Sequence, residues 1–386
     1  MSVIPYGRQD ISEADIAAVV DVLRSDYLTQ GPLVPRFEHE VAAFVGAKHA
    51  VAVNSATSAL HVACLALGLG PGDWLWTSPV TFVASANCAL YCGAQVDFVD
   101  IDPRTYNMSA SALEQKLLRA ETEGRLPKIV VPVHLCGQPC DMAAIHALSK
   151  RFGFSIVEDA SHAVGGRYRG LPIGNCQYSD VTIFSFHPVK IITTAEGGMA
   201  MTNDDGLANR MRLFRSHGIT RDVEQMTQVP DGPWYYQQIE LGYNYRMTEL
   251  QAALGLSQMS RLGPFVERRH HLARRYDEKL AALPLILPWQ HPDSYSGLHL
   301  YVVRVPGDAT RSHREVFASL REQGIGVNLH YIPVHTQPYY RNFGFKDGDF
   351  PEAEAYYAEA ISLPMYATLS EEQQDTVVAA LVKALG

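Results

Sequence analysis

Short apolar runs rich in β-branched residues alternate with helix-like segments through the first half of the chain. His49–Val53 reads H-A-V-A-V, and the segment after it, Ser55–Leu67, begins with hydroxyl residues typical of helix caps and ends at Gly68. Further strand-like runs lie at Gln95–Val99, Lys128–Val133, Ser155–Glu158 and Val181–Phe186. Because apolar strands separated by helices are typical of sheets covered on both faces, the pattern predicts an α/β fold with a largely parallel sheet.

The segments on either side of this alternation predict further helices and a second lobe. Helices are expected at about Glu13–Arg24 and Val34–Val45, another opens around Met247, and the charge-dense segment Glu267–Lys279 predicts a long exposed helix. The later elements are expected to be a strand at Leu298–Val305, a helix at Arg311–Gln323, a strand around Val327–Tyr331 and a closing helix from Glu371. We therefore expect a large domain over residues 1–245 and, over residues 246–386, a long linking helix with a smaller α+β domain.

Composition narrows the class of protein. The 386 residues include 32 basic and 41 acidic side chains, a net charge of −9, so a general binder of nucleic acid or of acidic membranes is not expected. Hydrophobic residues make up 47% and charged residues 19%, which is typical of a globular chain and not of a disordered one. The most apolar stretch, Val80–Ala94, is too short to span a bilayer, and no secretory signal is visible. We expect a cytoplasmic protein whose six cysteines are free thiols rather than metal ligands.

The segment Ser185–Gly198, S-F-H-P-V-K-I-I-T-T-A-E-G-G, places Lys190 just after an apolar strand. Considered alone, Lys190 is better interpreted as a structural lysine at a strand end, with its ammonium group reaching water, than as a functional lysine. Asp159 also ends a predicted strand, in S-I-V-E-D-A-S-H, and alone it would be a helix cap or a turn residue. The two are informative together, because open α/β sheets gather their ligands at the carboxyl ends of their strands.

A third segment, Asn54–Leu60 (N-S-A-T-S-A-L), is a strand-to-helix turn rich in small and hydroxyl residues. The exposed N–H groups of such a turn, the Thr57 hydroxyl and the helix dipole suit a phosphate, although an ordinary N-cap explains this segment equally well. Pyridoxal phosphate needs an amine, an acid for its pyridine nitrogen and a phosphate cradle, and Lys190, Asp159 and the Ala56/Thr57 turn supply one of each. Phe82 is the candidate for a ring over the cofactor face, or else a plain core phenylalanine.

These motifs resemble those of a known family, the DegT/StrS sugar-nucleotide aminotransferases, within the fold type I pyridoxal phosphate enzymes. The resemblance covers almost the whole chain through L-T-Q-G-P, N-S-A-T-S-A-L, V-E-D-A-S-H, S-F-H-P-V-K-x-x-x-x-A-E-G-G, R-S-H-G and G-Y-N-Y-R-M-T-E. It implies a mostly parallel seven-stranded sheet between helices, Lys190 as the Schiff-base lysine, Asp159 at the pyridine nitrogen and His162 near the ring hydroxyl. It also implies that Ser185 joins Ala56 and Thr57 at the phosphate, and that Asn244 reaches it from the neighbouring subunit of a homodimer.

Within the family, the chain is most similar to the branch that aminates UDP-linked 4-keto-6-deoxy sugars for pseudaminic acid synthesis. That resemblance implies a sugar-nucleotide pocket lined by Tyr6, Asp26, Tyr27, Leu28, Thr29, Ala56, Ser185, Asn244, His330 and Tyr331. One departure is the segment Asp222–Gln238, which is longer than expected for this branch and could reshape the pocket. The implied reaction is a ping-pong transamination with L-glutamate as the amino donor.

Three other functions agree less well with these residues than a transaminase does. A dehydratase of the same fold would carry histidine in place of the Schiff-base lysine, and Lys190 argues against it. A non-catalytic, cofactor-binding regulator is disfavoured by the intact pair of Lys190 and Asp159. A nucleotide-dependent oxidoreductase is suggested only by G-L-G-P-G at Gly68–Gly72, which follows a helix instead of a strand and so lacks the context of a dinucleotide fingerprint.

Overall fold

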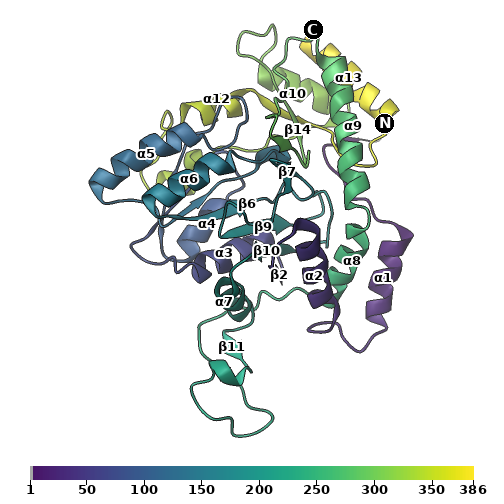
Figure 1. Cartoon of the computed structure of the whole chain (residues 1–386). Coiled ribbons are helices and arrows are strands. Elements are labelled where there is room, and N and C mark those ends of the chain that lie inside the picture. Colours follow the sequence, from purple (N-terminus) through teal and green to yellow (C-terminus); the bar gives the residue numbers. More distant parts are fainter. Residues whose placement is uncertain (1–2) are drawn as a thin grey trace.

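A seven-stranded sheet lies at the centre of the computed structural model, which describes residues 3–386 (Figure 1). In spatial order its strands are β2 (His49–Val53), β10 (Gly198–Thr202), β9 (Val181–Ser185), β6 (Ser155–Asp159), β5 (Ile129–Val131), β3 (Trp74–Thr77) and β4 (Gln95–Phe98). The strands from β9 to β4 pair in parallel, whereas β10 is antiparallel to both β9 and β2. The expected α/β fold with a mostly parallel seven-stranded sheet is therefore confirmed.

Two of the seven strands, β3 and β10, are absent from the predicted ones. Their sequences, W-L-W-T and G-M-A-M-T, each contain one β-branched residue, a threonine, and lack the β-branched runs of β5 and β9. Pairing with neighbours on both sides makes them strands, since β3 lies between β5 and β4, and β10 lies between β9 and β2. These two segments are therefore strands because of their neighbours in the sheet, and not because of their own sequences.

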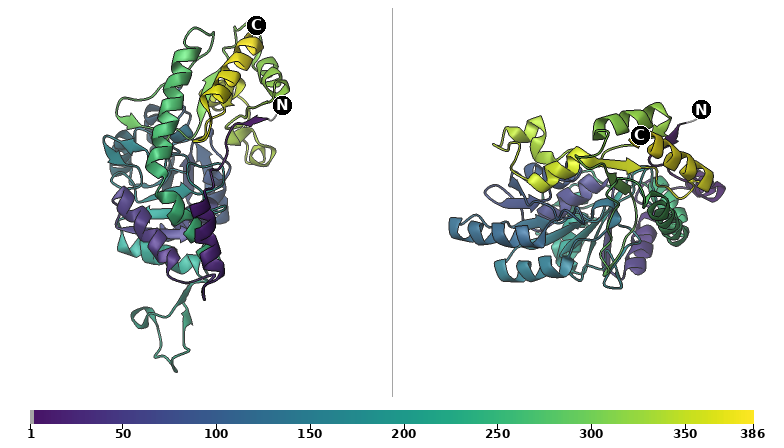
Figure 2. Two further views of the ribbon diagram at one scale, coloured as in Figure 1. Left: turned by 90° about the vertical axis from the view of Figure 1, so that its right-hand side faces the viewer. Right: turned by 90° about the horizontal axis from the view of Figure 1, so that it is seen from above.

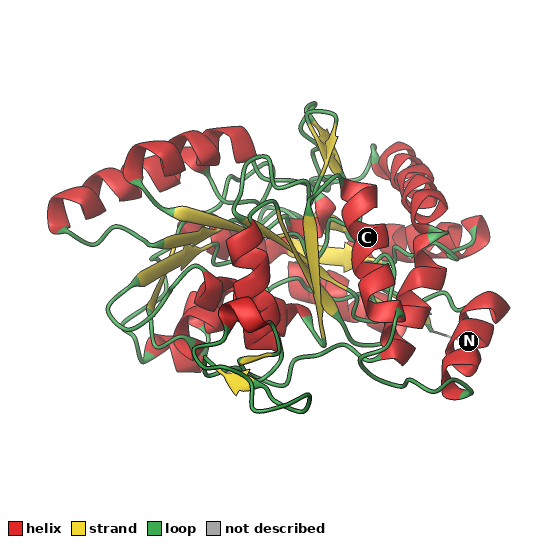
Figure 3. Ribbon diagram, turned by 60° about the horizontal axis from the view of Figure 1, so that its bottom comes forward, coloured by secondary structure: helices red, strands yellow, loops and turns green. Residues whose placement is uncertain are grey.

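Helices cover both faces of the sheet, as the red ribbons around the yellow strands show in Figure 3. The helices are α1 (Glu13–Leu23), α2 (Leu33–Val45), α3 (Ala56–Ala66), α4 (Ala84–Tyr91), α5 (Ala110–Glu123), α6 (Met142–Phe152), α7 (Asp205–Arg215), α8 (Glu249–Met259), α9 (Leu262–Leu280), α10 (His313–Glu322), α11 (Pro338–Arg341), α12 (Pro351–Glu359) and α13 (Glu371–Leu385). On β2, Val51 and Val53 pack in the core that contains α3, and Ala50 and Ala52 pack with Phe37 of α2. Burial of both faces explains the continuous apolar run of this strand.

The C-terminal part has a hydrophobic core of its own, built on α9, α10 and α13. Its strands are β14 (Tyr301–Arg304) antiparallel to β16 (Ala360–Leu363), and β1 (Ile4–Pro5) parallel to β15 (Ile325–Gly326). The expected charged helix, the helix after it and the closing helix correspond to α9, α10 and α13. The two-domain division at residue 245 stays a prediction, and residues 1 and 2 of its first domain lie outside the described residues.

Two strands expected in this part differ from those observed. The strand expected at Leu298–Val305 is confined to β14, because Leu298 has a φ of 48° and breaks the extended run. The prediction of a strand around Val327–Tyr331 is wrong. Only Asn328 forms a bridge there, with Ser362, and the chain then bends toward the sheet's carboxyl edge.

A narrow arm projects from the body of the protein below α7 (Figures 1 and 2). It begins with β11 (Ile219–Thr220), which pairs antiparallel with β12 (Gln237–Gln238), and it contains the whole segment Asp222–Gln238. A smaller sheet is formed by β13 (Ser294–Tyr295), β7 (Arg167–Tyr168) and β8 (Leu171–Pro172). Across residues 3–386, none of the helices combines the length and the apolar character needed to cross a membrane.

Candidate active site

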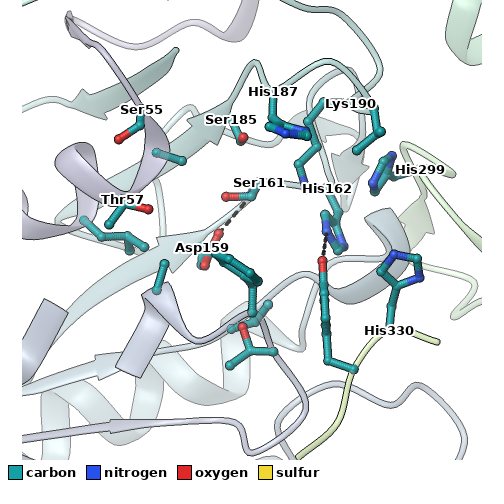
Figure 4. Close-up of a pocket in the computed structure, with 18 of the residues that line it drawn as sticks. Ser55, Thr57, Asp159, Ser161, His162, Ser185, His187, Lys190, His299 and His330 are labelled. Carbon is teal, nitrogen blue, oxygen red and sulfur yellow. Dashed lines mark hydrogen bonds between the residues drawn. The ribbon is translucent and has the colours of Figure 1, made fainter. Parts of the chain in front are cut away.

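A pocket of about 980 Å³ lies at the carboxyl edge of the parallel strands (Figure 4). The ends of β6 and β9, the start of α3 and the loop between β9 and β10 line it from the sheet side. The N-terminal segment contributes Tyr6, and the C-terminal part contributes His299 and residues 328–331. The pocket thus brings together segments that are far apart in the sequence, at the edge where α/β sheets bind ligands.

The first turn of α3 forms one end of the pocket. Ser55 caps the helix, and its Oγ accepts a hydrogen bond from the Ser58 N–H at 3.1 Å. Ala56 and Thr57 line the pocket at this turn, and Ser185 lines it from the end of β9. Gly198 brings β10 so close that a Cβ there would lie 2.5 Å from the Ala56 nitrogen. A capped helix N-terminus with hydroxyls beside it is suited to a phosphate group.

Lys190 lies in the loop that follows β9, with its side chain in the pocket. A turn hydrogen bond from the Lys190 N–H to the His187 carbonyl, at 2.9 Å, holds its backbone. Burial lowers the pKa of the Lys190 amine to about 8, although the negative charge of Asp159 acts in the opposite direction. At neutral pH a larger fraction of such a buried lysine is neutral than of a surface lysine, so more of it can act as a nucleophile or accept a proton.

Asp159 ends β6 and is buried at the pocket floor. Ser85 Oγ donates to Asp159 Oδ2 at 2.6 Å, and the Ser161 N–H donates to Oδ1 at 3.1 Å. Ser85 Oγ also lies 2.7 Å from Thr81 Oγ1, so a short chain of hydroxyls reaches the carboxylate. These contacts hold the carboxylate in one orientation, as an acid facing a cofactor ring nitrogen requires.

His162 is held by the backbone on one side and by a tyrosine on the other. The Cys136 N–H donates to its Nδ1 at 3.3 Å, and its Nε2 lies 3.0 Å from the Tyr331 hydroxyl. Burial, with the nearby Lys190 and His330, holds the pKa of His162 well below its ordinary value. The ring is therefore neutral, and because Nδ1 accepts a hydrogen bond, the proton lies on Nε2.

Four more predicted residues line the same pocket. Phe82 is 57% exposed and its ring centre is 6.2 Å from that of Tyr331, so the alternative of a core phenylalanine is wrong. His330 Nδ1 lies 2.8 Å from the Ser362 hydroxyl, and the His330 ring packs 5.1 Å from that of Tyr6. The structure thus brings Tyr6, Phe82, His330 and Tyr331 to the same pocket as Lys190.

Five predicted residues do not line this pocket. Asp26, Tyr27, Leu28 and Thr29 form an exposed loop, whose Thr29 bridges to Thr248. Asn244 follows the arm and bridges to Ser216. In a single chain these residues stand apart from Lys190, as expected of residues that serve a neighbouring subunit, and their roles stay predictions.

Several lining residues were not predicted from the sequence. The clearest are Ser161 and His299, and behind the lining Ser85 was also missed, although it donates to Asp159. No local signal marks Ser85, because Thr81 lies before α4 and only the fold brings Ser85 to Asp159. His299 lies in a run that looks like an ordinary alternating strand, so only the fold identifies it.

The residues present fit pyridoxal phosphate. They combine a buried amine with a lowered pKa, a fixed carboxylate and a helix N-terminus that β10 approaches too closely for a side chain at Gly198. No cluster suited to a metal ion occurs among residues 3–386. Fold and pocket together define a fold type I aminotransferase that uses pyridoxal phosphate.

Comparison with known proteins assigns the family. The model of the DegT/DnrJ/EryC1/StrS aminotransferase family matches residues 9–382, and the chain belongs to this family. It is 42% identical over 384 residues to the spore coat polysaccharide biosynthesis protein SpsC of Bacillus subtilis, covering 98% of this chain and 96% of SpsC. The chain is a sugar aminotransferase.

Solved structures agree with this assignment. Helicobacter pylori PseC, described as an aminotransferase involved in the biosynthesis of pseudoaminic acid, superposes with a TM-score of 0.91 at 31% identity, over 100% of this chain and 99% of PseC. The putative sugar aminotransferase Spr1654 from Streptococcus pneumoniae, in its PMP-form, superposes with a TM-score of 0.90 at 31% identity, over 99% of both chains.

Proposed function

We propose that this protein transfers an amino group from L-glutamate to C4 of a UDP-linked keto sugar, UDP-2-acetamido-2,6-dideoxy-β-L-arabino-hex-4-ulose. The product would be UDP-4-amino-4,6-dideoxy-N-acetyl-β-L-altrosamine, for pseudaminic acid synthesis. The observation that carries the reaction type is the single pocket that holds Lys190, Asp159 and the first turn of α3. Similarity to PseC supports the choice of sugar.

In this proposal Lys190 is the catalytic base. Pyridoxal phosphate, when bound, supplies an aldehyde carbon that bonds to amines and a ring that withdraws electrons from the carbon beside the nitrogen. Lys190 Nζ would hold the cofactor and would accept the proton at the α-carbon of the amino donor. Because burial lowers the pKa of this amine to about 8, roughly a tenth of it is neutral and able to accept that proton at pH 7, far more than of an ordinary lysine.

The other residues of the pocket hold and orient the cofactor. Asp159 faces the ring nitrogen and keeps its proton in place, an electrostatic role that Ser85 and the Ser161 N–H support by fixing the carboxylate. Ala56, Thr57 and Ser185 bind the phosphate. His162, whose Nε2 lies 3.0 Å from the Tyr331 hydroxyl, is beside the position proposed for the ring hydroxyl, and Phe82 covers the ring.

The sugar nucleotide is proposed to bind at the outer side of the pocket, against Tyr6, His330 and Tyr331. Asp26, Tyr27, Leu28, Thr29 and Asn244 are proposed to complete the site of a neighbouring subunit in a homodimer. The segment Asp222–Gln238, which forms the arm beside Asn244, would then lie at the subunit boundary.

A second candidate keeps the reaction and changes the sugar. The 42% identity to SpsC, a spore coat polysaccharide biosynthesis protein, exceeds the 31% identity to PseC. That observation favours another nucleotide-linked keto sugar destined for a surface polysaccharide. Both candidates share the donor half of the reaction.

Visible absorbance of the cofactor-loaded protein tests the proposal. L-glutamate should bleach the cofactor band, and the UDP-linked 4-keto sugar named above should restore it. Bleaching without recovery would retain the aminotransferase and point to the second candidate. A protein that shows no cofactor band after incubation with pyridoxal phosphate would refute both.

A further inference from the structure

His299 is a pocket residue with no role in the mechanism described above. It is only 3% exposed, it lines the pocket, and neither ring nitrogen has a hydrogen-bond partner within residues 3–386; Nδ1 is fully buried, so Nε2 is the nitrogen that can meet a ligand. The ring centre lies 4.5 Å from that of His162, on the side opposite to the phosphate cradle. Figure 4 shows Ser55 and Thr57 at one end of the pocket and His299 and His330 at the other, with Lys190 and His162 between them.

A buried guanidinium lies directly behind His299. Arg269 of α9 is 2% exposed, and its Nη1 donates to the carbonyl oxygens of Leu298 and His299 at 3.1 Å each and of Met365 at 3.0 Å. Burial lowers the pKa of Arg269 to about 10, so it stays charged at neutral pH, and no carboxylate contributes to that pKa. Its Nε also lacks a partner among residues 3–386.

A buried cation without a counter-ion is unfavourable unless something else in the protein or a ligand compensates it. Among the described residues no carboxylate contributes to the pKa of Arg269, and the three imidazoles at this end are uncharged, because burial holds the pKa of His162 and His299 well below the ordinary value and lowers that of His330 to about 4. The one buried carboxylate that lines the pocket, Asp159, accepts hydrogen bonds from Ser85 and Ser161 at the pocket floor. This end therefore has a positive potential and a free imidazole nitrogen, which together suit an anion.

We propose that His299, backed by Arg269, binds the α-carboxylate of the amino donor. The assignment rests on the proposed function and on where charge lies in the two substrates. In an α-amino acid the carboxylate is one bond from the carbon that reacts beside Lys190. In the keto sugar the reacting C4 is uncharged, and the diphosphate is attached several bonds away at C1. An anion site this close to Lys190 matches the amino acid.

Binding of an unreactive dicarboxylate to the cofactor-loaded protein tests the assignment. Glutarate should bind the wild type, as measured by calorimetry or by a shift of the visible spectrum, and glutaramide, its neutral diamide, should bind at least about tenfold more weakly. The variant His299→Phe keeps a ring but has no N–H, and it should raise the Kd for glutarate about tenfold or more. The same variant should raise KM for L-glutamate and leave KM for the keto sugar unchanged.

The variant His299→Gln keeps a side-chain N–H and should restore most of the glutarate affinity. It also covers the case in which His299→Phe fails to fold, because it can be compared directly with the wild type. An unchanged Kd in His299→Phe, equal rises of both KM values, or equal binding of glutarate and glutaramide would overturn the assignment. A wild type whose spectrum does not respond to L-glutamate would instead refute the proposed function.

Discussion

Lys190 and the three histidines around it are buried, and burial disfavours the charged form of each side chain. The pKa values of the Lys190 amine and of the His162, His299 and His330 imidazoles are all lowered. The amine is the only one of these groups whose lowered pKa, about 8, lies near physiological pH. The pocket therefore keeps its imidazoles neutral and leaves Lys190 as the group that exchanges protons.

The pH dependence of cofactor uptake tests the lowered pKa of Lys190. In cofactor-free protein the neutral amine is the nucleophile, so the rate of reaction with pyridoxal phosphate should rise with pH and level off above about 8, rather than near 10.5 as for an ordinary lysine. Asp159→Asn should move this midpoint to lower pH, because the Asp159 charge raises the pKa of Lys190. Stopped-flow absorbance measures both, and a midpoint near 10 in the wild type would contradict the expectation.

Ser85 is expected to act through Asp159. Ser85→Ala removes the donor to Asp159 Oδ2 and leaves a buried carboxylate oxygen without that partner, so kcat should fall about tenfold while the KM values change little. The control is Thr81→Ser, which removes a buried methyl group from the same cluster and keeps the hydroxyl next to Ser85. Steady-state kinetics and thermal unfolding of both variants separate the role of the hydroxyl from simple loss of packing.

Glu158 precedes Asp159 and points into the core. Burial would raise the pKa of Glu158, but hydrogen bonds with His134, Ser179 and Thr182 outweigh it, and the pKa is lowered. A lowered carboxyl pKa stabilises the fold above the unfolded-state pKa of about 4.3, and that contribution is lost as the pH falls through the folded-state value. Glu158→Gln should therefore destabilise the protein by about 1–3 kcal/mol at pH 7 and by less at pH 4. Urea unfolding at the two pH values checks this, and an equal difference at both would contradict it.

The phosphate cradle is made by the approach of one strand to the start of one helix. The first turn of α3 and the start of β10 lie so close that only glycine fits at position 198. Neither element has the complete cradle by itself, because the helix supplies the N–H groups and the strands supply Ser185 and the space.

Gly198→Ala should open this contact. The added Cβ would lie 2.5 Å from the Ala56 nitrogen, so α3 or β10 must shift, and the affinity for pyridoxal phosphate should fall at least about tenfold. Gly263→Ala is the matched control, because no atom lies within 4 Å of its added Cβ and alanine favours the helix there. Equilibrium dialysis of the cofactor compares the two, and equal affinities would show that the close approach is not needed.

The arm and the pocket each have a feature that bears on whether the protein forms a dimer. The arm exposes large apolar side chains, with Val229 87% and Trp234 72% accessible, which is unusual for a segment surrounded only by water. It leads directly into Asn244, which lies away from the Lys190 pocket of its own chain. Both features are those expected of a chain whose sites are completed by a second copy.

Subunit mixing tests the shared site. Lys190→Ala and Asn244→Ala proteins should each have little activity. After mixing and exchange, each mixed dimer has one intact site, so activity should recover to about a quarter of the wild-type value in a random mixture of two-fold dimers. The control is Lys190→Ala mixed with itself. Recovery would be absent if Asn244 served its own subunit or if the protein were a monomer.

Local patterns in the sequence were enough to predict the α/β class, five of the seven sheet strands and the family, because strand alternation, helix caps and the motifs around Lys190 and Asp159 are properties of neighbouring residues. Other features depended on contacts between distant segments. The strands β3 and β10, the bend after Asn328, the hydroxyl chain at Asp159 and the position of His299 arise where elements far apart in the chain pack together. Such contacts follow from packing and burial, which no short stretch of sequence contains.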